Sequence, residues 1–398
     1  MQHSFQSSSA RRAHRAGALA IAAGLLMLAA ASCGPEDNES APGGLPPRAP
    51  LPAPWEELED TFSPELVADT FSGLNHNMPV KLAQAPPPDG RLFVSVLDGT
   101  ILTIEAVPPW TQTVWATLPV LDGAEQGLLG IALSPGFGTN GHVYVMACVA
   151  GLPDKQQIIR FTDTGGVGTS PLVIVDDLPC MQTHNAGALK FGTDGTLYVT
   201  VGDAEDELNA QTDGSLAGRV LRFTEGGGAP ADNPRAAPDQ FEWCRGLRNS
   251  FGLCVHPGSG ILLGAENGPN ANDELNFLRP GKNFEWGAQT RVPGAQVGYR
   301  MLNWPTVIVP AGLTYHTGAE FPPGYSDNLF LCSYEDHEIL RFEMSGDPPV
   351  DVDYEHVFAR LTANFNANKP LDIIQGNDGS LYLSTFTQIW RIYARTGP

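Results

Sequence analysis

One phrase of apolar and polar residues recurs along the chain from about residue 88 onward. Each copy is a turn containing Gly or Asp, an alternating apolar run, and a second run that ends on Arg or an apolar pair. Alternation with a period of two is typical of a half-buried β-strand. Each copy therefore predicts two neighbouring antiparallel strands. The copies are residues 89–95 with 100–104, 141–145 with 158–161, 194–200 with 219–223, 260–264 with 274–277, 327–331 with 339–342, and 378–384 with 389–392.

The spacing of these copies predicts the architecture. About 50 to 70 residues separate them, which is room for a four-stranded antiparallel sheet and its loops, the blade of a β-propeller. No segment has a long 3.6-residue period. We therefore predict an all-β fold, a six-bladed β-propeller over residues 61–398. Residues 65–69 are expected to close the ring against the last blade, and residues 282–325 to form a loop excursion on the face that carries the site.

The first 33 residues have the layout of an export signal. Three arginines precede an apolar run over residues 16–31, which ends in small residues and Cys33. The run is short for a membrane span. Because Cys33 and the residues before it resemble a bacterial lipobox, we expect a lipoprotein anchored through Cys33 in the periplasm or on the outer surface. Ordinary cleavage without a lipid is the alternative.

Composition refines this picture. Residues 34–60 are rich in Pro and Gly with little periodicity, so we expect a tether between anchor and propeller. The formal net charge is −21, and removal of residues 1–33, with their three arginines and no acidic residue, makes it −24. Such a surface repels nucleic acid and anionic lipid head groups. A neutral substrate is the favoured partner.

Five cysteines follow Cys33, and their spacing matches no zinc site. In an exported protein they permit at most two disulfides and a remaining buried thiol. We expect one of the disulfides to join Cys244 and Cys254.

The densest cluster of candidate functional residues lies between residues 244 and 276. It contains two arginines, Asn249, and the neighbouring carboxylates of Asp273 and Glu274. Arginines bind carboxylates and developing oxyanions, while carboxylates and turn carbonyls are the oxygen ligands that Ca²⁺ prefers. The cluster predicts a site for an anionic ligand held together with a hard cation.

Three motifs resemble those of a known family. They are Gly-Leu-Leu-Gly at residues 127–130, Gly-x-Arg-Asn-x-x-Gly at 246–252, and Glu-x-Gly-Pro-x-x-x-Asp-Glu-x-Asn at 266–276. Together they resemble the glucose/sorbosone dehydrogenases, soluble quinoproteins that use pyrroloquinoline quinone (PQQ). The resemblance spans nearly all of residues 60–398. It implies oxidation of a neutral aldose and an external electron acceptor.

The resemblance also implies site residues. Arg248 and Asn249 match the pair that contacts the quinone, and Gly268, Pro269 and Asp273 match the calcium-binding turn.

Two further side chains are expected to face the same ligand. His184 stands where the family has its catalytic base, and a neutral imidazole suits that role near pH 7. Glu125 or Gln126, just before the Gly-Leu-Leu-Gly motif, is expected to face the ligand. Judged without the resemblance, His184 is better explained as an ordinary loop histidine, whereas the residues around Glu125 are equally compatible with a packed blade edge.

The chain departs from the family where three cations neutralise the carboxylates of PQQ. Glu335 stands at the lysine position, while Lys369 and Leu371 stand at the two arginine positions. The sequence therefore predicts a PQQ- and Ca²⁺-dependent sugar dehydrogenase with fewer cofactor contacts. The alternative is a non-catalytic cell-surface propeller that binds a glycan or a protein. A lactonase-type hydrolase has less support, because no ring of Asn, Glu and Asp ligands from several blades is evident.

Overall fold

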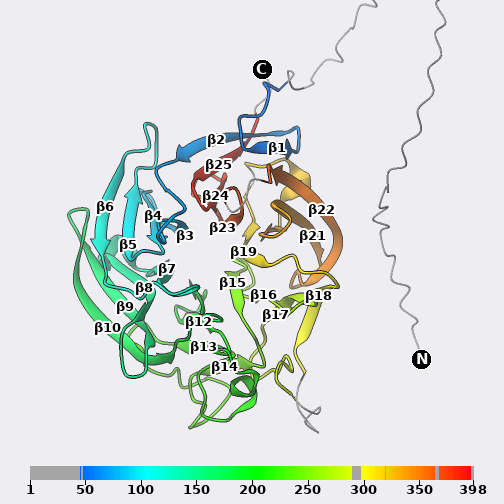
Figure 1. Cartoon of the computed structure of the whole chain (residues 1–398). Coiled ribbons are helices and arrows are strands. Elements are labelled where there is room, and N and C mark those ends of the chain that lie inside the picture. The colour runs from blue at the N-terminus through cyan, green and yellow to red at the C-terminus, as the bar shows by residue number, and fades with distance from the viewer. Residues whose placement is uncertain (1–44, 46–47, 289–296, 319, 364–366, 396–398) are drawn as a thin grey trace, which may run out of the picture. The chain divides into compact units, whose positions relative to one another are not determined.

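The computed structural model describes residues 45, 48–288, 297–318, 320–363 and 367–395 (Figure 1). The predicted signal peptide and Cys33 lie outside these residues. Six antiparallel sheets surround a common axis, which confirms the six-bladed β-propeller. In the part of the chain that the structure describes, no helix is long and apolar enough to span a bilayer.

From the axis outward, the strands of blades 1 to 4 follow chain order, and so do all but the outermost strands of blades 5 and 6. Blades 1 and 2 consist of β3 (Pro79–Gln84), β4 (Leu92–Val96), β5 (Thr100–Ile104), β6 (Gln112–Thr117), and of β7 (Leu128–Leu133), β8 (His142–Val149), β9 (Lys155–Thr164), β10 (Val167–Pro179). Blades 3 and 4 consist of β11 (Ala186–Phe191), β12 (Leu197–Val201), β13 (Arg219–Phe223), β14 (Glu242–Arg245), and of β15 (Ser250–Val255), β16 (Leu262–Glu266), β17 (Asp273–Phe277), β18 (Tyr299–Trp304). Blades 5 and 6 begin with β19 (Pro310–His316), β20 (Asn328–Ser333), β21 (Glu338–Ser345), β22 (Asp351–Leu361), and with β23 (Pro370–Gln375), β24 (Leu381–Thr385), β25 (Ile389–Ala394). Short helical turns are α1 (Phe137–Asn140), η1 (Glu207–Gln211) and η2 (Pro323–Tyr325).

The recurring phrase of the sequence corresponds to the second and third strands of each blade. The second strands are the most deeply buried, and β4, β12 and β24 are buried at every position. Residues 282–325, expected to be a loop excursion, contain regular structure instead. They include β18, the outer strand of blade 4, and β19, the inner strand of blade 5.

The N-terminal part of the propeller completes the two last blades. Strand β2 (Phe62–Ala68) pairs with β25, which confirms the expected ring closure. Strand β1 (Trp55–Leu58) pairs with β22 and adds a fifth strand to blade 5. The segment 34–60, expected to be a tether, therefore ends in a strand, because Trp55 and Leu58 bury their side chains in the core of blades 5 and 6.

Inner strands approach one another closely around the axis. A Cβ atom on Gly130 of β7 would lie 2.1 Å from the carbonyl oxygen of Gly187 on β11, so only glycine fits there. Between blades 6 and 1, Asp372 accepts hydrogen bonds from Lys81 Nζ (3.2 Å) and from the backbone N–H of Leu82 (2.9 Å). Both carboxylate oxygens thus fasten the last blade to the first.

The predicted Cys244–Cys254 disulfide is wrong. All five described cysteines are buried free thiols. Cys244 lies on the last strand of blade 3 and Cys254 on the first strand of blade 4, and they pack into different hydrophobic clusters. Ten residues of separation in the sequence suggested proximity, but the chain crosses between two blades within them.

Candidate active site

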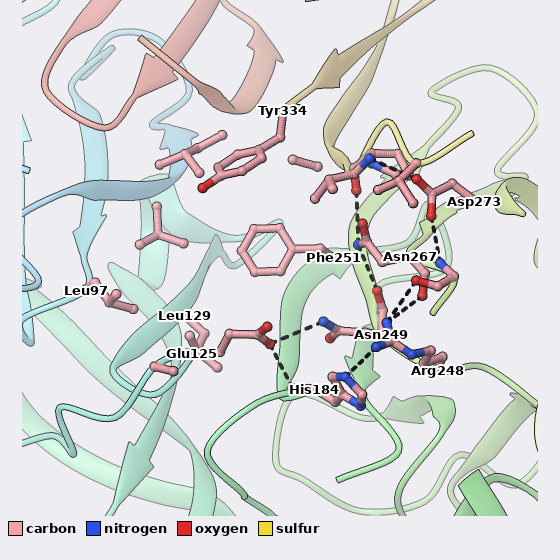
Figure 2. A pocket seen from close by; sticks show the side chains of 18 of the residues that line it. Leu97, Glu125, Leu129, His184, Arg248, Asn249, Phe251, Asn267, Asp273 and Tyr334 are labelled. Atoms are coloured by element: carbon pink, nitrogen blue, oxygen red, sulfur yellow. Dashed lines mark hydrogen bonds between the residues drawn. The ribbon is translucent and has the colours of Figure 1, made fainter. Parts of the chain in front are cut away.

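A cavity of about 390 Å³ opens at one end of the propeller axis. Its walls come from loops that precede inner strands and from loops between second and third strands, because both kinds lie at the same end of an antiparallel blade. One side is polar, with Glu125, His184, Arg248, Asn249 and Asn267 (Figure 2). The structure thus brings the predicted histidine, arginine and asparagine together from separate blades.

His184 is held with its Nε2 lone pair directed at Arg248. Arg248 Nη2 lies 2.6 Å from His184 Nε2, and His184 Nδ1 lies 2.7 Å from Asp203 Oδ1. A guanidinium can only donate hydrogen bonds, so Nε2 must accept. The proton of the neutral imidazole therefore resides on Nδ1 and is donated to Asp203. This is the tautomer that a general base acting through Nε2 requires.

Asp203, which we did not single out in the sequence, is the partner that fixes the histidine. It follows β12, its side chain is 2% exposed, and its second oxygen accepts from Trp286 Nε1 at 2.8 Å. A carboxylate immediately after a fully buried strand was the available signal. Its distance from His184 depends on the pairing of β11 with β12, which the sequence pattern does not specify at single-residue resolution.

Glu125 supports the loop of His184. Its Oε2 accepts from the backbone N–H of His184 (2.8 Å) and from Asn249 Nδ2 (3.2 Å), while Asn249 Oδ1 accepts from the backbone N–H of Ala186 (3.0 Å). His184 and Ala186 both adopt positive φ, 57° and 53°, so this loop needs external support. Glu125 and Asn249 line the cavity and also maintain the position of the histidine.

The buried carboxylate of Glu266 fixes the backbone of Arg248 and Asn249. Glu266 accepts both of their backbone N–H groups (2.8 and 2.7 Å) and the hydroxyl of Ser250. Burial raises the pKa of Glu266 to about 7, against the effect of these donors. The side chain of Arg248 then reaches over the Trp286 ring, with its Cζ atom 5.8 Å from the ring centroid.

Comparisons with known proteins identify the family. Residues 76–391 match the family model described as Glucose / Sorbosone dehydrogenase. The chain belongs to the glucose/sorbosone dehydrogenase family. It is 24% identical to quinoprotein glucose dehydrogenase B of Acinetobacter calcoaceticus, over 75% of this chain and 82% of the relative. It is 25% identical to the aldose sugar dehydrogenase YliI of Escherichia coli K12, over 65% of this chain and 74% of the relative.

A solved structure agrees with the fold. The PQQ-bound aldose sugar dehydrogenase of Streptomyces coelicolor superposes with a TM-score of 0.68 at 24% identity, covering 85% of this chain and all of the other. The matched family consists of dehydrogenases, so the chain belongs to a family of oxidoreductases.

The turn that the family resemblance assigns to calcium is occupied by protein hydrogen bonds. The carbonyl oxygens of Asn267 and Gly268 accept from Arg248 Nη1 at 3.0 and 3.2 Å. Asp273 is 1% exposed and accepts the backbone N–H groups of Gly268, Ile308 and Val309. Asp273 thus holds the turn of Gly268 and Pro269 against the loop before β19. No group of three or more His, Cys, Asp or Glu side chains suited to a metal occurs among the described residues.

The opposite side of the cavity is apolar. Leu371, 7% exposed, lines it together with Tyr334 and Phe386, whose rings lie 5.9 Å apart. Lys369 lies outside the cavity lining: its Nζ is 2.7 Å from Glu335 Oε2 and 4.2 Å from the centroid of the Tyr334 ring. The candidate cation is thus neutralised by the residue that replaces the family's lysine.

This donor set fits one edge of PQQ but not the whole cofactor. The polar side would offer Arg248 and Asn249 as donors to a quinone, whereas Leu371, Tyr334 and Phe386 offer no cation to its carboxylates. Each absent charge-assisted hydrogen bond costs about 1.5–3 kcal/mol of binding free energy. The described residues therefore do not fit a tightly bound tricarboxylate.

Proposed function

We propose that the protein is a sugar dehydrogenase that oxidises a hydroxyl of a neutral aldose, with His184 as the general base. The observation that carries the proposal is the chain of contacts from Asp203 through His184 to Arg248, at 2.7 and 2.6 Å, at the end of the cavity. Family membership supports it, because the characterised relatives are named glucose and aldose sugar dehydrogenases.

Proton removal follows from the tautomer. When a sugar hydroxyl replaces Arg248 as the partner of His184 Nε2, its proton passes to that nitrogen and its oxygen gains negative charge. Asp203 stabilises the imidazolium that forms, since its carboxylate already accepts from Nδ1. Arg248 loses its hydrogen bond to His184 Nε2 but remains beside the substrate oxygen, where its positive charge stabilises the developing negative charge. Completing the oxidation requires a two-electron acceptor for the hydride of the same carbon, which a quinone would supply if it were bound.

PQQ and Ca²⁺ are the cofactors that the family implies, and we propose no step through either. The relative from Acinetobacter calcoaceticus is named a quinoprotein. In this chain, the apolar wall and the Lys369–Glu335 pair argue for weak PQQ binding, and the contacts of Arg248 with the turn compete with a metal.

Reconstitution tests the proposal. The purified domain is incubated with PQQ and calcium, and bound chromophore and dye-linked oxidation of a panel of aldoses are measured. We expect aldose oxidation to depend on added quinone. The quinone concentration needed should be well above that which saturates a site with all three cations. No oxidation of any sugar at saturating quinone would contradict the proposal.

The apolar wall favours a second candidate. A propeller that retained the fold but not its cofactor would keep the buried hydrogen bonds and lose the cations. In this chain, Glu335 and Leu371 stand at two of the cation positions. Such a protein would bind a glycan or a protein ligand at the cell surface without catalysis. A bound glycan in the absence of any chromophore would favour this candidate over the first.

We also propose export and lipid attachment through Cys33, on the strength of the sequence layout. The wild-type protein is expected in the membrane fraction and a Cys33→Ser variant in the soluble fraction. A wild-type protein that is already soluble would favour ordinary cleavage.

A further inference from the structure

Two of the five described cysteines share one hydrophobic cluster. Cys148 and Cys180 pack in one cluster with Val80, Leu97 and Leu129, and each thiol is the main influence on the pKa of the other. The other three lie in three separate clusters. Among the described cysteines, only this pair is therefore placed for reaction between sulfur atoms.

The backbone around the pair is fixed on both sides. Cys148 lies on β8, where its N–H donates to Gly127 and its carbonyl accepts from Leu121. Cys180 directly follows β10. The neighbouring Pro179 carbonyl accepts from Gln156 Nε2 at 2.6 Å, which ties the end of β10 to β9. Both cysteines thus lie on backbone that the hydrogen bonds of blade 2 hold in place.

Cys180 is the first residue of the loop that carries His184. Within this loop, Asn185 Nδ2 donates to the Met181 carbonyl and its Oδ1 accepts from the Met181 N–H. The Gln182 carbonyl accepts from the N–H of Glu125 at 2.8 Å. A covalent bond at Cys180 would therefore anchor the start of the loop whose end presents the histidine.

The two thiols differ in reactivity. The neighbouring Cys148 thiol lowers the pKa of Cys180, whereas the Cys180 thiol, together with burial, raises the pKa of Cys148. Cys180 is 5% exposed, with Met181 beside it 45% exposed. Cys148 is fully buried. Cys180 is thus the thiol that meets an oxidant first.

We propose that Cys148 and Cys180 are a disulfide site that locks the His184 loop to blade 2 when the protein meets a disulfide oxidant. The Cys180 thiolate attacks a disulfide R–S–S–R and releases one thiol. Cys148 then loses its proton, attacks the Cys180 sulfur and releases the second thiol. The protein loses two electrons and two protons, and the oxidant is reduced to two thiols. An exported protein would meet such oxidants outside the cytoplasm.

Thiol mapping tests this without any variant. The purified full chain is equilibrated with oxidised glutathione, denatured, alkylated without reduction and digested with trypsin. We expect Cys244, Cys254 and Cys332 to be alkylated. Peptides 92–155 and 161–190 should appear as one linked species, separated by reduction. Full alkylation of Cys148 and Cys180 after oxidation, or a link from either to another cysteine, would overturn the proposal.

Variants extend the test to the loop. Cys148→Ser is expected to give no linked peptides and to leave Cys180 as its mixed disulfide with glutathione, because no second thiol resolves that bond. Cys244→Ser, the matched control, should retain the linked peptides. Reduction should lower the Tm of the oxidised wild type by roughly 5 °C and leave that of a Cys148→Ser/Cys180→Ser double variant unchanged. An equal effect of the reductant on both proteins would show that the bond does not hold the fold.

Discussion

The two sides of the cavity differ in how they depart from the family's pattern. On the side of blades 3 and 4, His184, Arg248 and Asn249 are connected by hydrogen bonds to buried carboxylates below them. On the side of blades 5 and 6, Leu371, Tyr334 and Phe386 form an apolar wall, and Lys369 is paired with Glu335 at its edge. The residues proposed to remove and accept a proton are present, whereas two of the three cations that would neutralise the PQQ carboxylates are absent.

The contrast shows that the residues for proton transfer and the cations expected to bind PQQ can be lost independently of one another. The polar side is part of the buried hydrogen-bond network, so loss of one member leaves other polar groups unpaired at a cost of about 1–3 kcal/mol each. A cation at the rim, in contrast, is replaced by leucine without leaving a buried partner. The cations can therefore be lost while His184 and Arg248 stay in place.

Removing the histidine tests the polar side most directly. His184→Ala should lower dye-linked aldose oxidation by about two to four decades, because the general base is lost. The fold should persist, since the loop is held through the backbone N–H of His184. Rates and thermal unfolding are compared with those of His356→Ala, which removes a partly exposed histidine paired with Glu343 on the outer part of blade 5. Equal losses in both variants would argue against a catalytic role.

Asp203 is expected to act through the histidine. Asp203→Asn should reduce kcat by about one to three decades, because an amide does not impose the Nδ1–H tautomer. KM should change little, as Asp203 does not line the cavity. Steady-state kinetics on the reconstituted enzyme measure both quantities, with Asp176→Asn, a surface partner of Lys155, as the control. An increase in KM with kcat unchanged would instead assign Asp203 to substrate binding.

The apolar side is tested by restoring charge. Glu335→Lys with Leu371→Arg should tighten PQQ binding by about one to two decades for each restored contact. The first change also releases Lys369 from its ion pair. Titration calorimetry compares the double variant with Glu343→Lys, which makes the same acid-to-lysine change at a residue that does not line the cavity. Unchanged affinity would mean that the wall differs from the family's in shape as well as charge.

Calcium should give the smallest effect. Calcium bound only by the folded state raises stability by mass action, so EDTA should lower Tm by a few degrees and calcium restore it. Arg248 already donates to the Asn267 and Gly268 carbonyls, so an Arg248→Ala variant should gain more from calcium than the wild type. Magnesium is the control in each melt. The absence of any shift in either protein would remove calcium from the site.

The fold was predictable because each blade repeats the same alternating pair of strands. Residues 65–69 precede the first repeat, so the last blade was the sheet they were expected to complete. The outer strands were less visible, and β1 and β18 were missed, since their exposed faces weaken the apolar alternation. For the site, His184, Arg248 and Asn249 were found from local motifs. Asp203 and the hydrogen bonds of Asp273 were not, because they depend on distances between blades.

The pairing of β2 with β25 imposes an order on biosynthesis. Phe62 lies opposite Ala394, so the ring can close only after almost the whole chain has emerged from the ribosome. Contacts so remote in sequence fold slowly, and until then β2 presents an unpaired edge open to other chains. A chain truncated before β25 would expose that edge permanently, so premature termination is expected to yield aggregates rather than a smaller propeller.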